Sequence, residues 1–348
     1  TLFMSLATRL LNPDGRGSFI VPRSFCSGAY FKRFRDDFLE SAQPLHIHLF
    51  DQRDNAFRGD AILQENLVFT FSQQSSLTNM SPVAITTSST IEALSDDLPI
   101  QTIPMNQFVN SRGLFRLPTS ALDRRILIIM DAWLGNLEAY GLSISTGPVV
   151  PFRAKNSLST VEAVRANTAV PLLWMQHVRP GRVTWPIQNG FRKAEGILHT
   201  EDGSELVVPL ANYVLLRRFS AKEEARRLIA APLLADDFQQ STIGLENHLN
   251  YVYRQQGVLS CTEVVGLTAV FNSGLIDRYF RISNGNTQVN ATELRTLPLP
   301  KWSTIQSIGA DLRFKEKDTV DVDAVVMKHL KQTSEVPDDL PVMRETRG

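Results

Sequence analysis

Apolar residues recur at helical spacing near the start of the chain, and short apolar runs follow. Leu2, Leu6 and Leu10 fall on one helical face, and the stretch 30–39 has the same period. These two patterns predict helices over 1–11 and 30–39. Apolar runs bounded by Gly, Pro or polar residues predict strands at 17–22, 45–50 and 62–71. This order of helices and strands predicts one end of an α/β sheet.

The pattern changes after residue 71. Residues 72–118 are rich in Ser, Thr, Asn and Gln, and short strands are expected near 83–87 and 103–109. A long helix is expected over 120–140, where apolar residues recur on one face behind the capping residue Ser120. Farther on, the pattern predicts strands at 172–176 and 213–219 and helices at 222–229 and 267–280. The whole indicates a mixed α+β domain over 119–332, followed by a polar tail, 333–348, that we expect to be disordered.

Charge adds one local feature to this picture. Lys and Arg (36) balance Asp and Glu (36), so the formal net charge is zero. Between residues 141 and 194, however, a single acidic residue, Glu162, stands against seven basic ones: Arg153, Lys155, Arg165, Arg179, Arg182, Arg192 and Lys193. Such a basic segment can follow DNA phosphates. The alternative is a solvated charged face.

Other features limit the class of protein. No apolar run approaches the roughly 20 residues that a membrane span needs, so no membrane partner is expected. Cys26 and Cys261 form no metal or redox pattern, which favours a reducing cytoplasm. His46 and His48 face the same side of a predicted strand, but no third ligand lies near them in sequence, so we expect no metal site.

The stretch 282–300, ISNGNTQVNATELRTLPLP, concentrates amide side chains beside a glycine. An Asn or Gln amide can pair with the edge of adenine through two hydrogen bonds, so Asn284, Asn286 and Gln288 are candidate base-reading residues. The alternative is a loop whose amides bond to each other and to the backbone. Asn290 and Glu293 have the spacing of a capping box, which predicts a short helix after Asn290.

A series of blocks carries a resemblance to a known family. They are GRGSFIVPRSF (15–25), FKRFRDDFL (31–39), LFDQRDNAFRGDAILQENLVFTF (49–71), GLSISTGPVVPFR (141–153), RVTWP (182–186), YVLLRRFSAKEEARR (213–227), ENHLNY (246–251) and FNSGLIDRYFRISNGNTQVNATELRTLPLP (271–300). In this order they resemble the C-terminal half of adenine-N6 DNA methyltransferases of restriction–modification systems.

The resemblance implies an organisation, a cofactor and a partner. Residues 1–75 would be the last strands of a Rossmann-like methyltransferase sheet, 76–118 a connecting segment, and 119–332 a mixed α+β target-recognition domain. The partner would be double-stranded DNA and the methyl donor S-adenosylmethionine. The family's glycine-rich cofactor turn and its Asn/Asp-Pro-Pro-Tyr/Phe motif are absent from the chain, which has no Pro-Pro at all. We therefore expect this chain to be inactive by itself.

The resemblance also implies roles for individual residues. Phe57 occupies the position whose ring stacks on an adenine rotated out of the duplex, and Arg53 and Arg58 beside it could hold phosphates. The alternative is a loop phenylalanine under the sheet edge. Arg153 and Lys155 could contact the DNA backbone or a guanine, although a structural ion pair would also account for Arg153.

Further DNA contacts are expected in the second half of the chain, but the role of the chain stays open. Arg182 precedes Trp185 in a basic segment that suits a DNA groove, and Asn284, Asn286 and Gln288 would lie near the DNA side of the recognition domain. The chain could be the reading half of a methyltransferase whose catalytic half lies upstream. It could also be a DNA-binding specificity subunit without catalysis, or part of a nuclease–methyltransferase fusion. The residues that precede Thr1 would distinguish these possibilities.

Overall fold

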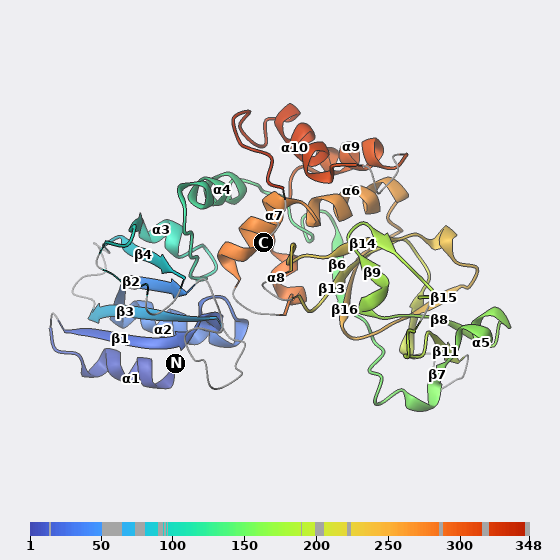
Figure 1. Ribbon diagram of the computed structural model, residues 1–348, viewed down its shortest axis with the longest axis horizontal. Helices are drawn as coiled ribbons and strands as arrows, with labels where there is room; N and C mark the ends of the chain where they lie inside the picture. The colour runs from blue at the N-terminus through green and yellow to red at the C-terminus, as the bar shows by residue number, and fades with distance from the viewer. Residues whose placement is uncertain are drawn as a thin grey trace. The chain divides into compact units, whose positions relative to one another are not determined.

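The structure is a computed structural model that describes residues 1–13, 15–50, 65–73, 81–89, 93, 95, 97–188, 190–198, 205–220, 224–284, 288–314 and 320–344. The chain divides into two compact units (Figure 1). Unit 1 comprises residues 1–128 and 278–286, and unit 2 comprises 129–277 and 287–348. The division falls inside helix α4 (Ala121–Asp131) and inside helix α7 (Gly274–Ser283). Each unit is described by itself.

Unit 1 is built on one five-stranded sheet with the order β1-β3-β2-β4-β5. The strands are β1 (Arg16–Pro22), β2 (Ala42–Phe50), β3 (Asn66–Gln73), β4 (Val83–Ser88) and β5 (Gln101–Ile103). Strand β3 pairs antiparallel with both β1 and β2, whereas β2 and β4 run parallel. Strand β1 therefore forms one edge of the described sheet, and no described strand pairs with its outer side.

Aromatic side chains fill the core of unit 1. The core lies between the sheet and helices α1 (Leu2–Leu10), α2 (Lys32–Ser41) and α3 (Met105–Phe108). Phe69 of β3 is fully buried, and its ring centroid lies 5.3 Å from that of Phe38 and 5.4 Å from that of Phe25. Such tilted and edge-on pairs are favoured by the ring quadrupoles. The alternation of apolar residues in LVFTF directs Leu67, Phe69 and Phe71 to one face of the sheet.

The described residues of unit 2 form two larger sheets and one short hairpin. The first sheet has the order β12-β15-β8-β11-β7, the second β14-β13-β16-β6, and β9 pairs with β10. The strands are β6 (Leu142–Thr146), β7 (Leu158–Ser159), β8 (Ala169–Leu173), β9 (Val178–Arg179), β10 (Arg182–Val183), β11 (Gly196–Leu198), β12 (Val207–Pro209), β13 (Tyr213–Arg217), β14 (Ala230–Leu233), β15 (Thr242–Leu245) and β16 (Leu249–Arg254). Its helices besides α7 are α5 (Val161–Arg165), α6 (Cys261–Phe271), α8 (Ala291–Arg295), α9 (Trp302–Leu312) and α10 (Val322–Gln332).

Helices α6 and α9 of unit 2 cross at very short range (Figure 1). A Cβ added at Gly266 would lie 2.0 Å from the Ile305 carbonyl oxygen, and one at Gly309 would lie 1.9 Å from the Thr262 carbonyl oxygen. Each helix therefore needs a residue without a side chain at this crossing. The two glycines let the backbones meet where any larger residue would force them apart.

Most predicted elements of the first 90 residues are confirmed, including the helices near 1–11 and 30–39 and the strands near 17–22, 45–50, 62–71 and 83–87. The strand expected over 103–109 is wrong, because the chain forms the short strand β5 and then helix α3. The helix expected over 120–140 ends at Asp131. Beyond it, the Gly135 carbonyl accepts a 2.8 Å hydrogen bond from the Leu299 N–H, and this pairing excludes a continued helix.

Two further helix predictions are corrected. Residues 224–229 of the stretch 222–229 are not helical: the Arg227 N–H binds the Asp277 carboxylate at 2.5 Å, and the Ile229 carbonyl pairs with Arg217 beside β14. The helix expected over 267–280 is interrupted between α6 and α7. There the Asn272 amide binds both backbone groups of Ala230, at 2.8 and 2.9 Å, which ties the break to β14.

The C-terminal strands and tail can be compared with the sequence in the same way. The strand expected over 213–219 is present as β13, and the one expected over 172–176 is shifted to β8. Within the stretch 333–348, for which we expected disorder, Val336 and Leu340 are buried in unit 2. The expected mixture of helices and sheets is confirmed as a mixed α/β architecture. Among the described residues, no helix has both the length and the apolar character to cross a membrane.

Candidate nucleic-acid interface

A turn that follows β6 carries two of the predicted DNA-contacting residues; we call residues 147–155 the basic turn. Its backbone is anchored to the end of β15 and to the start of β16. The Gly147 N–H donates to the Leu249 carbonyl at 2.9 Å, and the Val149 N–H donates to the Leu245 carbonyl at 3.0 Å. A Cβ on Gly147 would lie 2.4 Å from the Glu246 carbonyl oxygen, so this close approach requires glycine.

The side chains of the basic turn alternate between core and solvent. Val149 is fully buried, and Ala154 is nearly so. Between them Phe152 is 67% exposed, and Arg153 and Lys155 are exposed too. The Arg153 guanidinium carbon lies 5.3 Å from the centroid of the Phe152 ring. Among the described residues no carboxylate forms an ion pair with Arg153, so its charge is presented to solvent.

A chain of hydrogen bonds joins the basic turn to the segment that carries Gln288. The Asn247 N–H donates to the Val149 carbonyl at 2.9 Å, and an Arg218 Nη donates to the Asn247 carbonyl at 2.7 Å. The Val289 N–H then donates to the Arg218 carbonyl at 2.7 Å. The basic turn, the Asn247 turn and the segment that carries Gln288 therefore lie together at one end of the β6-β16-β13 sheet. Gln288 is exposed there.

One buried amide fixes this arrangement. Asn250 is fully buried in β16, and its Oδ1 accepts from the Thr146 hydroxyl at 3.0 Å. Its Nδ2 donates to the Val289 carbonyl at 3.0 Å. The side chain thus connects the end of β6 to the Gln288 segment. A buried amide whose groups are all bonded favours one arrangement of its neighbours.

His248 belongs to the same surface, although it was not among the predicted site residues. Its side chain is 44% exposed, and its Nδ1 is bonded to the carboxylate of Glu246, which is only 1% exposed. The Phe219 ring packs against the imidazole, with the centroids 5.0 Å apart. The pattern Glu246-Asn247-His248 was the available signal, since a carboxylate and a histidine two residues apart can pair across a turn. The other nitrogen of the ring, Nε2, makes no hydrogen bond to Glu246.

The hairpin of β9 and β10 presents two more cations. Arg179 and Arg182 are opposite each other in its register, and both are exposed. Gly181 closes the turn between them with φ +71°, a conformation that favours glycine. Trp185, which follows, packs on the core and donates from its indole to the Glu195 carbonyl at 3.1 Å. Trp185 is therefore a residue of the core.

The other predicted site residues are placed differently or lie outside the description. Phe57, Arg53, Arg58 and Asn286 lie outside the described residues, so their roles stay predictions. Asn284 belongs to unit 1 and is 6% exposed, which leaves it little surface for a ligand. The predicted helix after Asn290 is confirmed as α8, and the Glu293 carboxylate accepts from the Asn290 N–H at 3.1 Å.

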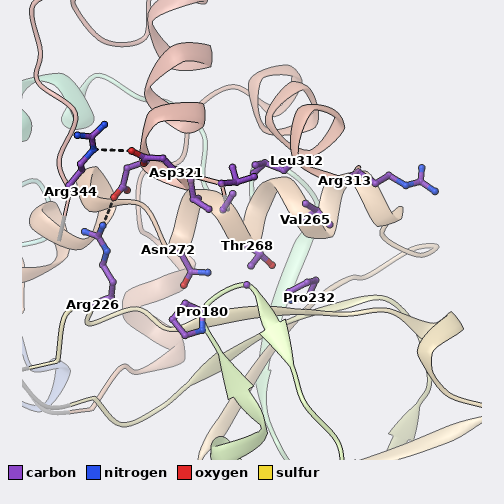
Figure 2. Close-up of a pocket in the computed structure, with 15 residues that line it drawn as sticks. Pro180, Arg226, Pro232, Val265, Thr268, Asn272, Leu312, Arg313, Asp321 and Arg344 are labelled. Atoms are coloured by element: carbon purple, nitrogen blue, oxygen red, sulfur yellow. Dashed lines mark hydrogen bonds and ion pairs between the residues drawn. The ribbon is translucent and has the colours of Figure 1, made fainter. Parts of the chain in front are cut away.

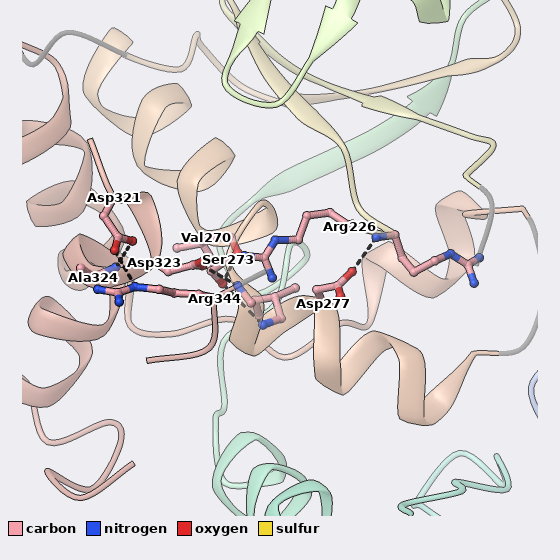
Figure 3. A network of polar contacts seen from close by, with 11 residues as sticks. Arg226, Val270, Ser273, Asp277, Asp321, Asp323, Ala324 and Arg344 are labelled. Atoms are coloured by element: carbon pink, nitrogen blue, oxygen red, sulfur yellow. Dashed lines mark hydrogen bonds and ion pairs between the residues drawn. The ribbon is translucent and has the colours of Figure 1, made fainter. Parts of the chain in front are cut away.

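Unit 2 also has a cavity of about 480 Å³ between helix α6 and the β9–β10 turn (Figure 2). Its walls are mainly apolar, and two ion pairs close one side. Arg226 meets the Asp323 carboxylate at 2.5 Å, and Arg344 meets Asp321 at 2.9 Å. Asp323 also accepts from the Gly274 N–H at 2.7 Å, so these contacts fasten the start of α10 to the start of α7 (Figure 3). We assign this network a structural role.

The described residues do not assemble a metal site. Among them, no group of three or more His, Cys, Asp or Glu side chains is placed to hold an ion. His46 and His48 instead share the Thr86 hydroxyl, at 2.9 and 2.8 Å, and burial lowers the pKa of His46. Both rings serve the packing between β2 and β4.

Comparisons with known proteins place the chain in a class. The model of the Eco57I restriction-modification methylase family matches residues 1–57. The chain is 32% identical to the Type II methyltransferase M.PstI of Providencia stuartii over 94% of its own length, which is 64% of that protein. It is also 32% identical to the Type II methyltransferase M.BsuBI of Bacillus subtilis over 88% of its length and 60% of that protein.

A solved structure shows a similar fold. The Type IIL restriction-modification enzyme MmeI, determined in complex with DNA, aligns with 96% of this chain at a TM-score of 0.55 and 10% identity, over 49% of its own chain. The resemblance to restriction–modification methyltransferases seen in the sequence is thus confirmed: the chain belongs to the family of the Type II methyltransferases. It spans less than two thirds of the length of either curated relative.

Proposed function

We propose that the chain is the DNA-recognition part of a site-specific adenine-N6 DNA methyltransferase that uses S-adenosylmethionine on double-stranded DNA. The observation that carries this proposal is the surface of unit 2 on which the basic turn, His248 and Gln288 lie together. Exposed cations there suit phosphates, and exposed amide and imidazole groups suit the edges of bases. Relatedness to Type II methyltransferases supports the same assignment.

Features of unit 1 support a separation of DNA recognition and catalysis between two parts of the proposed enzyme. Its β1 forms an edge of the described sheet, and the neighbouring helix α1 exposes four large apolar residues: Leu2 at 86%, Phe3 at 78%, Leu6 at 54% and Leu10 at 72%. An unpaired edge and an apolar helix face both favour further polypeptide. We infer that the Rossmann-like sheet continues into a catalytic part, which would supply the cofactor turn and the Pro-Pro motif that this chain lacks.

The proposed reaction transfers a methyl group to the exocyclic amine of an adenine, which must leave the base stack to be reached. Phe57 is our candidate for stacking on that base, with Arg53 and Arg58 on the flanking phosphates. S-adenosylmethionine would supply the methyl group from the catalytic part. The residues of unit 2 would fix the register of the protein on the duplex, through the basic turn, Arg182 and Gln288.

The proposal is tested with the full-length native protein. DNA treated with this protein and S-adenosylmethionine is digested to nucleosides and analysed by mass spectrometry. We expect N6-methyladenine and no methylcytosine. Methylcytosine would contradict the adenine assignment. Duplex binding without methylation would favour a specificity subunit without catalysis, and cleavage of the duplex would indicate a fused nuclease.

DNA binding by unit 2 is tested separately with the chain as given. Its affinity for duplex DNA is measured across a salt series, because binding through phosphate contacts weakens steeply with salt. We expect the logarithm of the binding constant to fall linearly with the logarithm of the salt concentration. The variant Asn250→Leu tests the surface, since it removes the bonds to Thr146 and Val289 but keeps a side chain of similar volume. Wild-type affinity in a folded Asn250→Leu would contradict the proposed arrangement.

A further inference from the structure

We propose that Phe152 enters the DNA duplex as an apolar wedge that contacts bases directly, while Arg153 behind it holds the adjacent backbone. This inference rests on the proposed function, which it deepens by naming a residue that reads or unstacks the target site. Apolar side chains of DNA-binding proteins can insert between base steps or pack on thymine methyl groups.

The exposure of Phe152 is a built feature of the turn. The residues on either side are held: Val149 is fully buried, and the Ala154 N–H donates to the Val150 carbonyl at 3.0 Å. The Arg153 N–H binds the same carbonyl at 2.9 Å. The backbone therefore points the Phe152 ring outward from a closed turn. A ring held in this way loses little conformational entropy when a partner covers it.

An exposed phenylalanine leaves apolar surface in water that a partner could cover. Burying such a side chain is favourable because it removes apolar surface from water. Phe152 is 67% exposed, so most of this stabilisation is not gained in the chain alone. The partner that suits the surroundings is polyanionic, because Arg153 and Lys155 are exposed on the same turn. A DNA duplex offers both parts of the match, phosphates outside and apolar base faces within.

The cation at the ring strengthens this match. The Arg153 guanidinium lies 5.3 Å from the Phe152 centroid, so the ring steadies the cation while both remain exposed. The segments of His248 and Gln288 are joined to the Val149 end of the turn through Asn247 and Arg218. The turn and the segments bonded to it therefore supply an apolar ring, a cation and hydrogen-bonding groups, which together suit direct base contact.

A second exposed pair provides a matched control. Phe314 is 85% exposed at the end of α9, and the Arg313 guanidinium also lies 5.3 Å from its ring. This pair has the same chemistry but belongs to a different part of unit 2. If exposure and a neighbouring cation were sufficient for DNA contact, the two pairs would behave alike. We expect only Phe152 to matter.

The experiment begins with duplexes enriched from a random pool by the chain itself. 2-Aminopurine, which becomes more fluorescent when it is unstacked, then replaces successive adenines in the enriched duplex. We expect the wild type to raise fluorescence at one position. Phe152→Ala should abolish this rise and weaken binding about tenfold to hundredfold, the range for loss of one base–aromatic stack. Phe152→Trp should restore both, and Phe314→Ala should leave both unchanged.

The outcomes separate the wedge from the proposed function. If no duplex is enriched, DNA recognition itself is contradicted. If duplexes are enriched but Phe152→Ala keeps both the affinity and the fluorescence of the wild type, the wedge is wrong and DNA recognition stands. Arg153→Ala should reduce the slope of affinity against salt by about 0.9, the value for one phosphate contact, without removing the fluorescence rise. Loss of the rise in Arg153→Ala together with full retention in Phe152→Ala would also overturn the proposal.

Discussion

Unit 1 and unit 2 use arginine in different ways. In unit 1, Arg35 is 1% exposed and donates to the carbonyls of Phe25, Gly28 and Gly113 at 2.7–2.9 Å. In unit 2 the cations of the basic turn and the β9–β10 hairpin are exposed. Unit 2 does bury Arg226 and Arg227, but in its own internal contacts. Buried arginines thus serve internal contacts in both units, whereas the cations of the basic turn are exposed and are among those that we propose for DNA.

The hydrophobic cores of the two units also differ in the residues that fill them. Unit 1 has one core rich in phenylalanine around a single sheet. Two cores of unit 2 are smaller and mostly aliphatic, and its helices α6 and α9 meet through glycines. Large rings stabilise a sheet through many van der Waals contacts. Close backbone packing instead fixes the ends of the strands from which loops emerge. This contrast can be tested by substitutions matched between the units.

The largest effect is expected from Phe69→Ala in unit 1. Phe69 is fully buried among four other phenylalanine rings, so the change leaves a cavity that the stacked rings cannot fill. We expect the free energy of unfolding to fall by about 3–5 kcal/mol, measured by urea denaturation. Phe3→Ala is the control, because Phe3 is 78% exposed and should change little. A loss below about 1 kcal/mol at Phe69 would contradict the role of the aromatic core.

The next effect concerns the helix crossing of unit 2. In Gly309→Ala the new methyl group would meet the Thr262 carbonyl at 1.9 Å, so α6 and α9 must separate. We expect a loss of about 2–3 kcal/mol, near the upper part of the range for overpacking. Ser307→Ala, two residues away and exposed on the same helix, is the matched control. Equal stability of the two variants would show that the crossing tolerates a side chain.

A pH effect of intermediate size is expected in both units. Burial lowers the pKa of His46 in unit 1, and burial, opposed by the hydrogen bond to Glu195, lowers the pKa of His177 in unit 2. Each lowered pKa means that the unfolded chain takes up a proton at a higher pH than the folded chain. Stability is therefore fully present above about pH 6.5 and falls as the pH drops below it, by at most about 1.4 kcal/mol per pH unit for each histidine.

This pH dependence is measured from urea midpoints between pH 7.5 and 5. His46→Gln should flatten the decline of unit 1 alone, since its side chain no longer titrates. An unchanged slope in that variant would assign the decline to other groups. The histidines thus give one reporter in each unit for comparing the response of the two cores to acid.

The smallest effect on stability, and the most specific effect on function, is expected from Arg182→Ala. Because Arg182 is exposed in the β9–β10 hairpin, stability should change by less than about 0.5 kcal/mol. The slope of duplex affinity against salt should decrease by about 0.9, the loss of one phosphate contact. Arg9→Ala in α1 of unit 1 removes an equally exposed cation and should leave the slope unchanged. Equal slopes in the two variants would remove the distinction between the units.

Local patterns in the sequence determined several elements of the fold. The helix near 1–11, the strands near 17–22 and 62–71, and the capping box at Asn290 are decided within a few residues, because periodicity and caps act over one or two turns. The resemblance to methyltransferases was readable from ordered blocks. Arg153, Lys155 and Arg182 could be selected from charge alone, and all three are exposed.

Other features were decided only by contacts between distant segments. The helix expected over 120–140 stops because Gly135 pairs with Leu299, and the stretch 222–229 is not helical in its described part because its backbone binds Asp277 and β13. His248 and Phe152 gain their places when β6, β16 and β13 pair and bring their ends together. Pairing between strands far apart in sequence leaves no local pattern, so only the tertiary structure assembles this surface.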